Sequence, residues 1–236
     1  MKTLSITSES RGHVKHDWLE SYHTFSFADY HDPKRMNFGL MRVLNDDIVQ
    51  PAKGFASHSH QNMEIITIPL SGILAHQDHL GNKSTIEPGE VQIMSAGTGI
   101  IHSEYNASKT ENVNLFQIWI FPKEKQILPR YGQKKFPIDQ RKNAFQCVVS
   151  PDEREGSLWI NQDAFIHLAN LEKGTKKQFI LQNPDHGAFV MMVQGSAKVA
   201  GTVLKNRDAI GVSETGSFDI ETHENTDLVV FEIPMN

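Results

Sequence analysis

The sequence predicts an all-β protein built from two antiparallel β-barrels. Three observations lead to this class. The apolar segments are short, rich in Ile, Val and Phe, and bounded by Gly, Pro, Asn or Asp, a pattern typical of strands joined by turns. Helical periodicity is hard to find anywhere in the chain. The same order of strands and turns occurs twice, and many short strands at regular spacing favour a barrel or a sandwich.

The individual strands follow from these apolar segments and from the turn residues between them. Gly81 lies in a Leu-Gly-Asn turn and Gly89 in a Glu-Pro-Gly-Glu turn. Glycine supplies the positive φ that such turns need, and proline presets the φ of its own position. The clearest predicted strand regions are 63–77, 91–97 and 113–122 in the first half and 189–204 and 227–234 in the second.

The two halves repeat one another weakly. The first half runs through a strand, Gly72, a strand, a turn at Pro88 and a further strand before it reaches Leu-Phe-Gln-Ile-Trp-Ile-Phe-Pro. The second half runs through a strand, Gly195, a strand, a turn at Asp208 and a further strand before it reaches Leu-Val-Val-Phe-Glu-Ile-Pro. The similar order and spacing predict two copies of one barrel unit.

A charged segment with two prolines, residues 123–143, separates the two copies and suits a connection between domains. We therefore expect an N-terminal barrel over residues 1–125 and a C-terminal barrel over 126–236. The lysine-rich part, residues 123–135, is interpreted as a solvated linker. Residues 151–157 are expected to form a surface loop.

Composition excludes several classes of protein. Among 236 residues, 39% are hydrophobic and 22% are charged, as in an ordinary globular protein, and the net charge of −5 argues against direct nucleic-acid binding. No apolar run approaches the roughly 20 residues of a membrane helix. The N-terminus lacks the apolar region of a secretory signal. Cys147 is the single cysteine and lies in an apolar run, so we expect a buried, inert thiol and a cytoplasmic location.

Histidine is the residue type that points to function. The chain has twelve histidines, and nine of them lie in the first half. His58 and His60 are spaced i, i+2, so in a strand both imidazoles lie on one face. His102 and Glu104 have the same spacing and follow a glycine-rich turn. Two such pairs on facing strands would bring three imidazoles and one carboxylate together inside a barrel.

This donor set predicts a metal site with positions left open for a substrate. Three nitrogen ligands and one oxygen ligand suit Fe, Mn, Co, Ni, Cu or Zn. Open positions favour redox or hydrolytic chemistry over a closed structural site. A single His-x-His pair is also common on surface strands, and it is the second pair that favours the metal site.

The remaining candidates have simpler explanations. His76 and His79 flank the turn at 78–82 and are expected to face solvent, as is His223 in another polar turn. The three tryptophans, Trp18, Trp119 and Trp159, are expected to be packing residues.

The two pairs resemble the two motifs of the cupin superfamily. Residues 99–106, Gly-Ile-Ile-His-Ser-Glu-Tyr-Asn, match the core of the second motif, and residues 58–64, His-Ser-His-Gln-Asn-Met-Glu, match the first. A longer pattern resembles the pirin family almost continuously over residues 22–122, and more loosely over the second half. The segments that carry it are 23–33, 38–55, 58–72, 76–82, 86–106 and 115–122.

The resemblance implies a bicupin, two jelly-roll barrels packed together, with iron in the N-terminal barrel. Carried over by position, the ligands are His58, His60, His102 and Glu104. The general cupin motif takes its carboxylate from the first motif, which would be Glu64, whereas pirins take it from the second. We prefer Glu104 because it shares strand parity with His102, and we expect Glu64 to line the pocket or to support the ligands.

The second half lacks the ligands at the corresponding positions. Counting from Gly195 and from Asp208 gives Leu181, Asn183, Ile220 and Thr222. None of these four can make the same site, and Glu221 and His223 are one residue out of register. The C-terminal barrel is therefore expected to hold no metal and to serve packing, pocket closure or partner binding.

Bacterial pirins resemble quercetin 2,3-dioxygenases, so the resemblance implies an enzyme that cleaves a small aromatic flavonol such as quercetin with O₂. Glu104 would accept the proton of the flavonol hydroxyl. The alternative is a redox-sensing regulator that acts through iron and a protein partner without turnover, as in eukaryotic pirins. A zinc-dependent hydrolase or isomerase of the cupin type is a third interpretation. We expect a monomer without direct contacts to nucleic acid or membrane.

Overall fold

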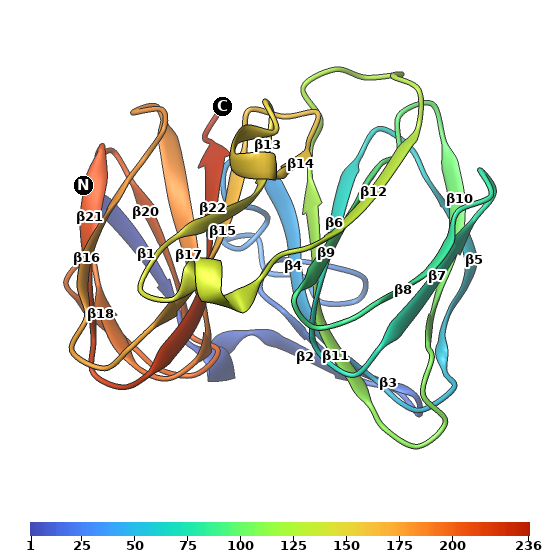
Figure 1. Ribbon diagram of the computed structural model, residues 1–236, viewed down its shortest axis with the longest axis horizontal. Helices are drawn as coiled ribbons and strands as arrows, with labels where there is room; N and C mark the ends of the chain where they lie inside the picture. The colour runs from blue at the N-terminus through green and yellow to red at the C-terminus, as the bar shows by residue number, and fades with distance from the viewer.

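The computed structural model describes residues 1–236 as two β-barrels side by side, joined through their larger sheets (Figure 1). Each barrel consists of a seven-stranded and a four-stranded sheet, and the helical segments are three short 3₁₀ turns, η1 (Ser8–Ser10), η2 (Ile138–Arg141) and η3 (Arg154–Gly156). The prediction of an all-β protein with two antiparallel barrels is confirmed. No helix of the structure has the length and apolarity needed to cross a membrane.

The N-terminal barrel has eleven strands, which are given in their order across each sheet. The large sheet holds β12 (Arg130–Lys135), β9 (Glu90–Ser95), β6 (Glu64–Ser71), β11 (Val113–Ile120), β4 (Met41–Val49), β3 (Leu19–His23) and β2 (Gly12–Lys15). The small sheet holds β5 (Gly54–His60), β10 (Ile100–Asn106), β7 (Leu74–Asp78) and β8 (Lys83–Ile86).

The C-terminal barrel repeats this arrangement. Its large sheet holds β1 (Lys2–Ile6), β20 (Ala209–Ser213), β17 (His186–Gln194), β22 (Thr226–Pro234), β15 (Phe165–Leu171), β13 (Gln146–Ser150) and β14 (Leu158–Trp159). Its small sheet holds β16 (Lys176–Ile180), β21 (Ser217–Thr222), β18 (Ala197–Val199) and β19 (Thr202–Leu204). The order β9-β6-β11-β4-β3 corresponds to β20-β17-β22-β15-β13, so the weak repeat in the sequence is a repeat of topology.

Two edge strands cross between the barrels. β1 pairs with β20 of the C-terminal barrel, and β12 pairs with β9 of the N-terminal barrel. Each exchanged strand covers a sheet edge that would otherwise offer unpaired backbone groups. The sheets therefore do not divide at residue 125. The interpretation of residues 123–135 as a solvated linker is wrong for β12, because the backbone of Arg130–Lys135 completes a sheet, although the side chains of Arg130, Lys134 and Lys135 are exposed.

Strand alternation separates the contact between the barrels from the barrel interiors. On β11, Phe116 and Ile118 join a cluster of 25 buried apolar residues between the two large sheets, whereas Leu115 and Trp119 face the interior of the N-terminal barrel. The interior of the C-terminal barrel is filled by 16 buried apolar residues. The N-terminal barrel holds apolar clusters of only 5 and 4 buried residues, and buried polar side chains lie between them.

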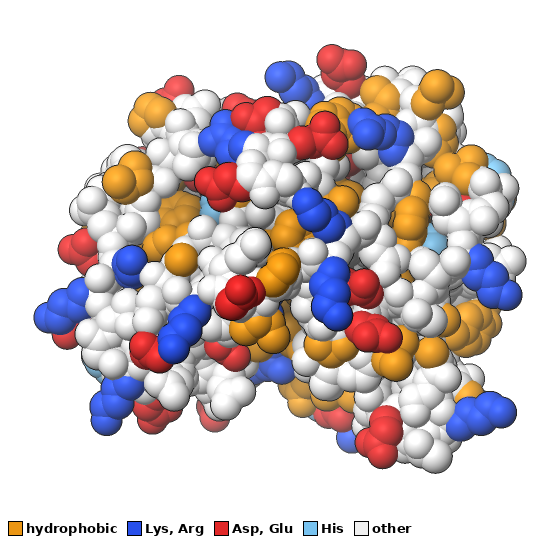
Figure 2. Space-filling view, in the orientation of Figure 1, with side chains coloured by type: hydrophobic (Ala, Val, Ile, Leu, Met, Phe, Trp, Pro, Cys, Tyr) orange, Lys and Arg blue, Asp and Glu red, His pale blue; other side chains and the backbone are white.

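On the face shown in Figure 2, acidic and basic side chains are interspersed over both barrels. No extended basic patch is present on this face, in keeping with the net charge of −5.

Candidate metal centre

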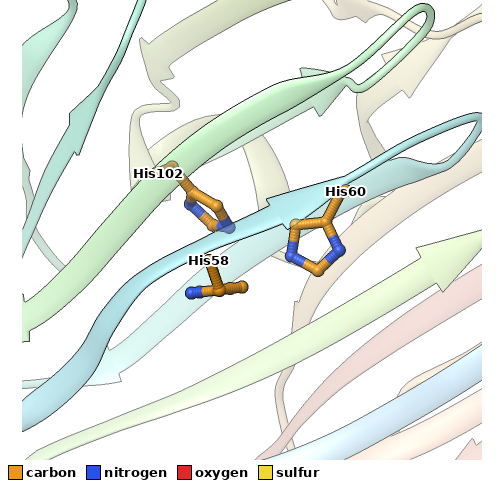
Figure 3. A group of neighbouring side chains, drawn as sticks. All are labelled: His58, His60 and His102. Atoms are coloured by element: carbon orange, nitrogen blue, oxygen red, sulfur yellow. The ribbon is translucent and has the colours of Figure 1, made fainter.

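Three histidines converge inside the N-terminal barrel. His58 and His60 come from β5 and His102 comes from β10, and the antiparallel register of these strands places His102 opposite His58 (Figure 3). The ring centroids are 4.4 Å apart for His58–His102, 4.9 Å for His58–His60 and 5.0 Å for His60–His102. One ring nitrogen from each histidine lies within 4.8 Å of the others. The spacing of the two sequence pairs therefore produces the expected cluster of imidazoles.

The protonation of these rings suits a metal ion. The Nδ1 of His58 donates to the carbonyl oxygen of Ala56 at 2.7 Å, which leaves the lone pair of Nε2 free. Burial, with the neighbouring imidazoles, lowers the pKa of His60 to about 4 and the pKa of His102 to about 3. Both rings are therefore neutral at pH 7, as metal ligands must be.

His102 gives the strongest evidence that the cluster suits a metal ion. Its side chain is 2% exposed, and both ring nitrogens are buried without a hydrogen-bond partner in the protein. A buried polar atom without a partner costs about 1–3 kcal/mol. A metal ion at the three histidines would satisfy one of these two nitrogens, so the residues present fit the metal that the sequence implies.

Glu104 lies two residues after His102 on β10 and, like His102, is buried inside the barrel. Its carboxylate is fully buried and accepts hydrogen bonds from Gln117 Nε2 at 2.9 Å and from Thr67 Oγ1 at 3.5 Å. It falls within 4.8 Å of ring nitrogens of His102 and His76, and these three form a second candidate ligand group. His102 is thus shared by two groups, one with His58 and His60 and one with Glu104.

The carboxyl group of Glu104 has an unusual environment for an acid. Burial, together with the nearby carboxyl of Asp47 on β4, raises the pKa of Glu104 to about 7. Burial raises the pKa of Asp47 to about 7 as well, and its carboxyl accepts a hydrogen bond from Ser21. Two carboxyl groups that resist ionisation in one barrel can take up protons near neutral pH.

The prediction for Glu64 is wrong. We expected it beside the metal ligands, but its Oε2 accepts hydrogen bonds from Ser95 Oγ at 2.7 Å and from the backbone N–H of Asn161 at 3.2 Å, at the junction of the two barrels. The reason is the turn at Asn62, which has a φ of 50°. The turn lies between the end of β5 in the small sheet and the start of β6 in the large sheet. The i, i+2 parity of His60 therefore does not continue to Glu64.

Glu64→Gln is expected to gain stability over the unmodified chain as the pH rises from 5 to 8. Burial raises the pKa of Glu64 to about 7. Between the unfolded value and about 7, the folded chain binds the extra proton, so the contribution of Glu64 to stability falls with rising pH. The gain should be on the order of 3 kcal/mol at most. Urea unfolding of both proteins, with metal chelated, measures it.

The comparison with the unmodified chain cancels the opposite pH dependence of the buried histidines. Glu9→Gln, which removes an exposed carboxylate, serves as the control for the loss of one negative charge. A Glu64→Gln difference that changes with pH no more than that of Glu9→Gln would contradict the assignment.

His76 is the second correction. It was expected to face solvent, but its side chain is buried, with an exposed fraction of 1%. It lies on β7, and its ring is 5.4 Å from that of His102. Sequence reasoning also missed Asp78, which is buried two residues further along the same strand. The signal was present in the i, i+2 spacing of these two residues, the same spacing that identified the other pairs.

Several simpler expectations agree with the structure. His79 and His223 are exposed. Cys147 is buried, and burial raises the pKa of its thiol to about 11, so the thiol is inert near neutral pH. Trp119 packs edge-on against His60, with ring centroids 4.9 Å apart, and against Phe27 at 5.3 Å. An aromatic side chain therefore lies directly beside the histidine cluster.

The four counted positions in the C-terminal barrel carry structural side chains. Leu181 and Ile220 belong to its apolar core. Thr222 donates its hydroxyl to the backbone oxygen of Glu172, and Asn183 accepts the backbone N–H of Asp185 in a turn.

Two barrels packed through their large sheets, with a cluster of imidazoles inside one of them, define a two-domain cupin with a candidate metal centre in its N-terminal barrel. The family model of pirin matches residues 6–120, and the model of the quercetinase C-terminal cupin domain matches residues 147–233. The chain belongs to the pirin family.

Individual relatives agree with this assignment. The chain is 41% identical over 227 residues, 96% of each chain, to the quercetin 2,3-dioxygenase of Escherichia coli K12. It is 39% identical over 222 residues to a pirin-like protein of Caulobacter vibrioides, covering 94% of this chain and 95% of the relative. Among solved structures, the bacterial pirin YhhW of Escherichia coli in complex with nickel(II) superposes with a TM-score of 0.94 at 39% identity, covering 99% of both chains.

Proposed function

We propose that this protein is a metal-dependent dioxygenase that cleaves flavonols such as quercetin with O₂ at a mononuclear iron held by His58, His60, His102 and Glu104. The observation that carries the proposal is the buried ring of His102, whose two nitrogens lack any partner in the protein while the imidazoles of His58 and His60 converge on it. The relatives named quercetin 2,3-dioxygenase support the choice of reaction.

The ligand set combines three imidazole nitrogens and one carboxylate oxygen, which accommodates iron and also nickel. A carboxylate oxygen of Glu104 lies within 4.8 Å of a ring nitrogen of His102, which precedes it by two residues on β10. A bound metal of this kind supplies Lewis-acid and redox chemistry, and lowers the pKa of a hydroxyl group that coordinates it. His58 and His60 are half-buried, so a substrate has access to the cluster from their side.

The side chains around the cluster suit a flat, aromatic substrate. Trp119 presents aromatic surface next to His60, and Phe27 packs against Trp119, so a flavonol ring can pack against an aromatic side chain at the cluster. Glu104, with a pKa of about 7, accepts the proton of the flavonol hydroxyl as general base. The hydrogen bond from Gln117 holds the carboxylate in place during this transfer. The buried setting keeps bulk water from competing for the proton.

Oxygen uptake with quercetin tests the proposal. The protein is stripped with a chelator, reloaded with Fe²⁺ under anaerobic conditions, and mixed with quercetin and O₂. We expect one O₂ to be consumed, and one carbon monoxide released, for each quercetin cleaved. Stripped and zinc-loaded samples serve as controls and should be inactive. Turnover that survives complete metal removal, or an iron-loaded protein that consumes no O₂, would overturn it.

A further inference from the structure

A buried histidine, His76, and a buried aspartate, Asp78, lie on β7, next to His102 and Glu104 on the neighbouring strand β10. β7 runs antiparallel to β10, and the register places Asp78 opposite His102 and His76 opposite Glu104. The four side chains therefore form one block on the inner face of the small sheet. The side chains of His76 and Asp78 are both fully buried, and His76 Nε2 lies 3.4 Å from Asp78 Oδ2.

Asp78 is held in one orientation by the turn that follows it. Its Oδ1 accepts the backbone N–H groups of Leu80 and Asn82, each at 3.0 Å, and its Oδ2 accepts the side-chain amide of Asn82 at 2.8 Å. A carboxylate can only accept hydrogen bonds, so the proton between Asp78 and His76 is on Nε2 of the histidine. The other ring nitrogen of His76, Nδ1, then carries a lone pair.

This lone pair of His76 has no partner. Nδ1 is buried without a hydrogen bond. The ring cannot easily turn away, because it stacks on Tyr131 at 4.9 Å with an interplanar angle of 27°, and the hydroxyl of Tyr131 is itself bonded to Ser84 and Gln133. The structure thus holds a buried acceptor in a fixed position beside His102.

His102 needs such an acceptor. A histidine that binds a metal through one ring nitrogen carries a proton on the other, and this outer N–H normally donates to a carboxylate, a carbonyl or a similar group. His58 has the carbonyl of Ala56 for this purpose. His102 has no such bond, but ring nitrogens of His102 and His76 lie within 4.8 Å of one another. Glu104 is the other acceptor in that group, and it is assigned as a metal ligand.

We propose that Asp78 and His76 form a carboxylate–histidine pair that receives the outer N–H of His102 and so fixes its ring for metal binding. His76 is a positioning residue in this assignment, and the inference rests on the metal site of the proposed function. The assignment requires a hydrogen bond of about 3 Å between the outer ring nitrogen of His102 and Nδ1 of His76 in the metal-bound protein.

Nickel(II) binding measured by calorimetry tests the pair. His76→Phe keeps a ring of similar shape but removes the acceptor, and Asp78→Asn turns an N–H₂ toward Nε2, which moves the proton of His76 to Nδ1. Both variants should bind Ni²⁺ about 10- to 100-fold more weakly than the unmodified chain. His223→Gln changes an exposed histidine of the C-terminal barrel and should bind like the unmodified chain.

Nitrogen NMR of the zinc-loaded protein shows directly which nitrogen of each histidine ring carries a proton. A general loss of packing would not move the proton of His76 from one ring nitrogen to the other. We expect His76 to be protonated at Nε2 in the unmodified chain and at Nδ1 in Asp78→Asn. If His76→Phe does not fold, the second variant and the NMR spectrum decide.

Two results overturn the inference while the metal site stands. One is nickel binding by the folded variants as tight as in the unmodified chain, and the other is a proton on Nδ1 of His76 in the unmodified chain. If the unmodified chain binds no nickel and no zinc, the metal site itself fails and the inference fails with it.

Discussion

His60→Ala is expected to abolish both metal binding and flavonol cleavage. The substitution removes one of the three imidazoles whose ring nitrogens lie within 4.8 Å of one another, and alanine offers no ligand atom in its place. The loss of metal affinity should exceed the roughly 10- to 100-fold that removal of an outer hydrogen-bond partner costs. Oxygen uptake with quercetin should then fall to the level of the metal-stripped protein. Metal content after dialysis and O₂ consumption measure the two effects.

The fold should survive this change. His60 is half-buried, lies at the end of β5 and packs against the rings of Trp119, His58 and His102 without a hydrogen bond to them, so thermal unfolding of the stripped protein should change little. His16→Ala, at an exposed position outside the cluster, is the matched control and should keep both metal and turnover. A His60→Ala protein that retains a full equivalent of iron would remove His60 from the ligand set.

Strand alternation explains how much of the candidate site could be predicted from the sequence. His58 and His60, and His102 and Glu104, are spaced so that any strand puts each pair on one face, and this inference needs no knowledge of the partner strand. The structure keeps both pairs inside the same barrel. Strand alternation does not reach Glu64, because the chain leaves one sheet for the other at Asn62, between His60 and Glu64.

What the sequence could not provide depends on long-range pairing. His76 flanks a turn, and such positions are usually solvated, but its side chain faces the barrel interior, where the ring of Tyr131 from the distant strand β12 packs on it. The exchange of β1 and β12 between the barrels is equally invisible, because each strand pairs with an edge far away in the chain. Local sequence patterns predict where a strand lies and which of its side chains share a face. Which strands pair with one another depends on contacts between distant parts of the chain.

Glu104→Gln is expected to lower flavonol turnover by about 10²- to 10⁴-fold, the usual contribution of a general base. The amide has nearly the shape of the carboxylate and can still meet Gln117, so the barrel should remain folded. An amide nitrogen cannot accept the proton of the flavonol hydroxyl, and an amide oxygen is a weaker metal ligand than a carboxylate. The three histidines remain, so the variant should retain more metal than His60→Ala does.

The pH dependence separates the two roles of Glu104. The base must be ionised to act, so turnover of the iron-loaded protein should fall on the acidic side, at a pH at or below about 7, because a nearby cation lowers the pKa that burial raises. Glu104→Asp keeps a carboxylate, though one withdrawn from the cluster, and should show the same acid limb at reduced rate. Glu104→Gln should lack the limb. An acid limb unchanged in Glu104→Gln at saturating iron would assign the proton transfer to another group, of which Asp47 is the nearest buried candidate on β4.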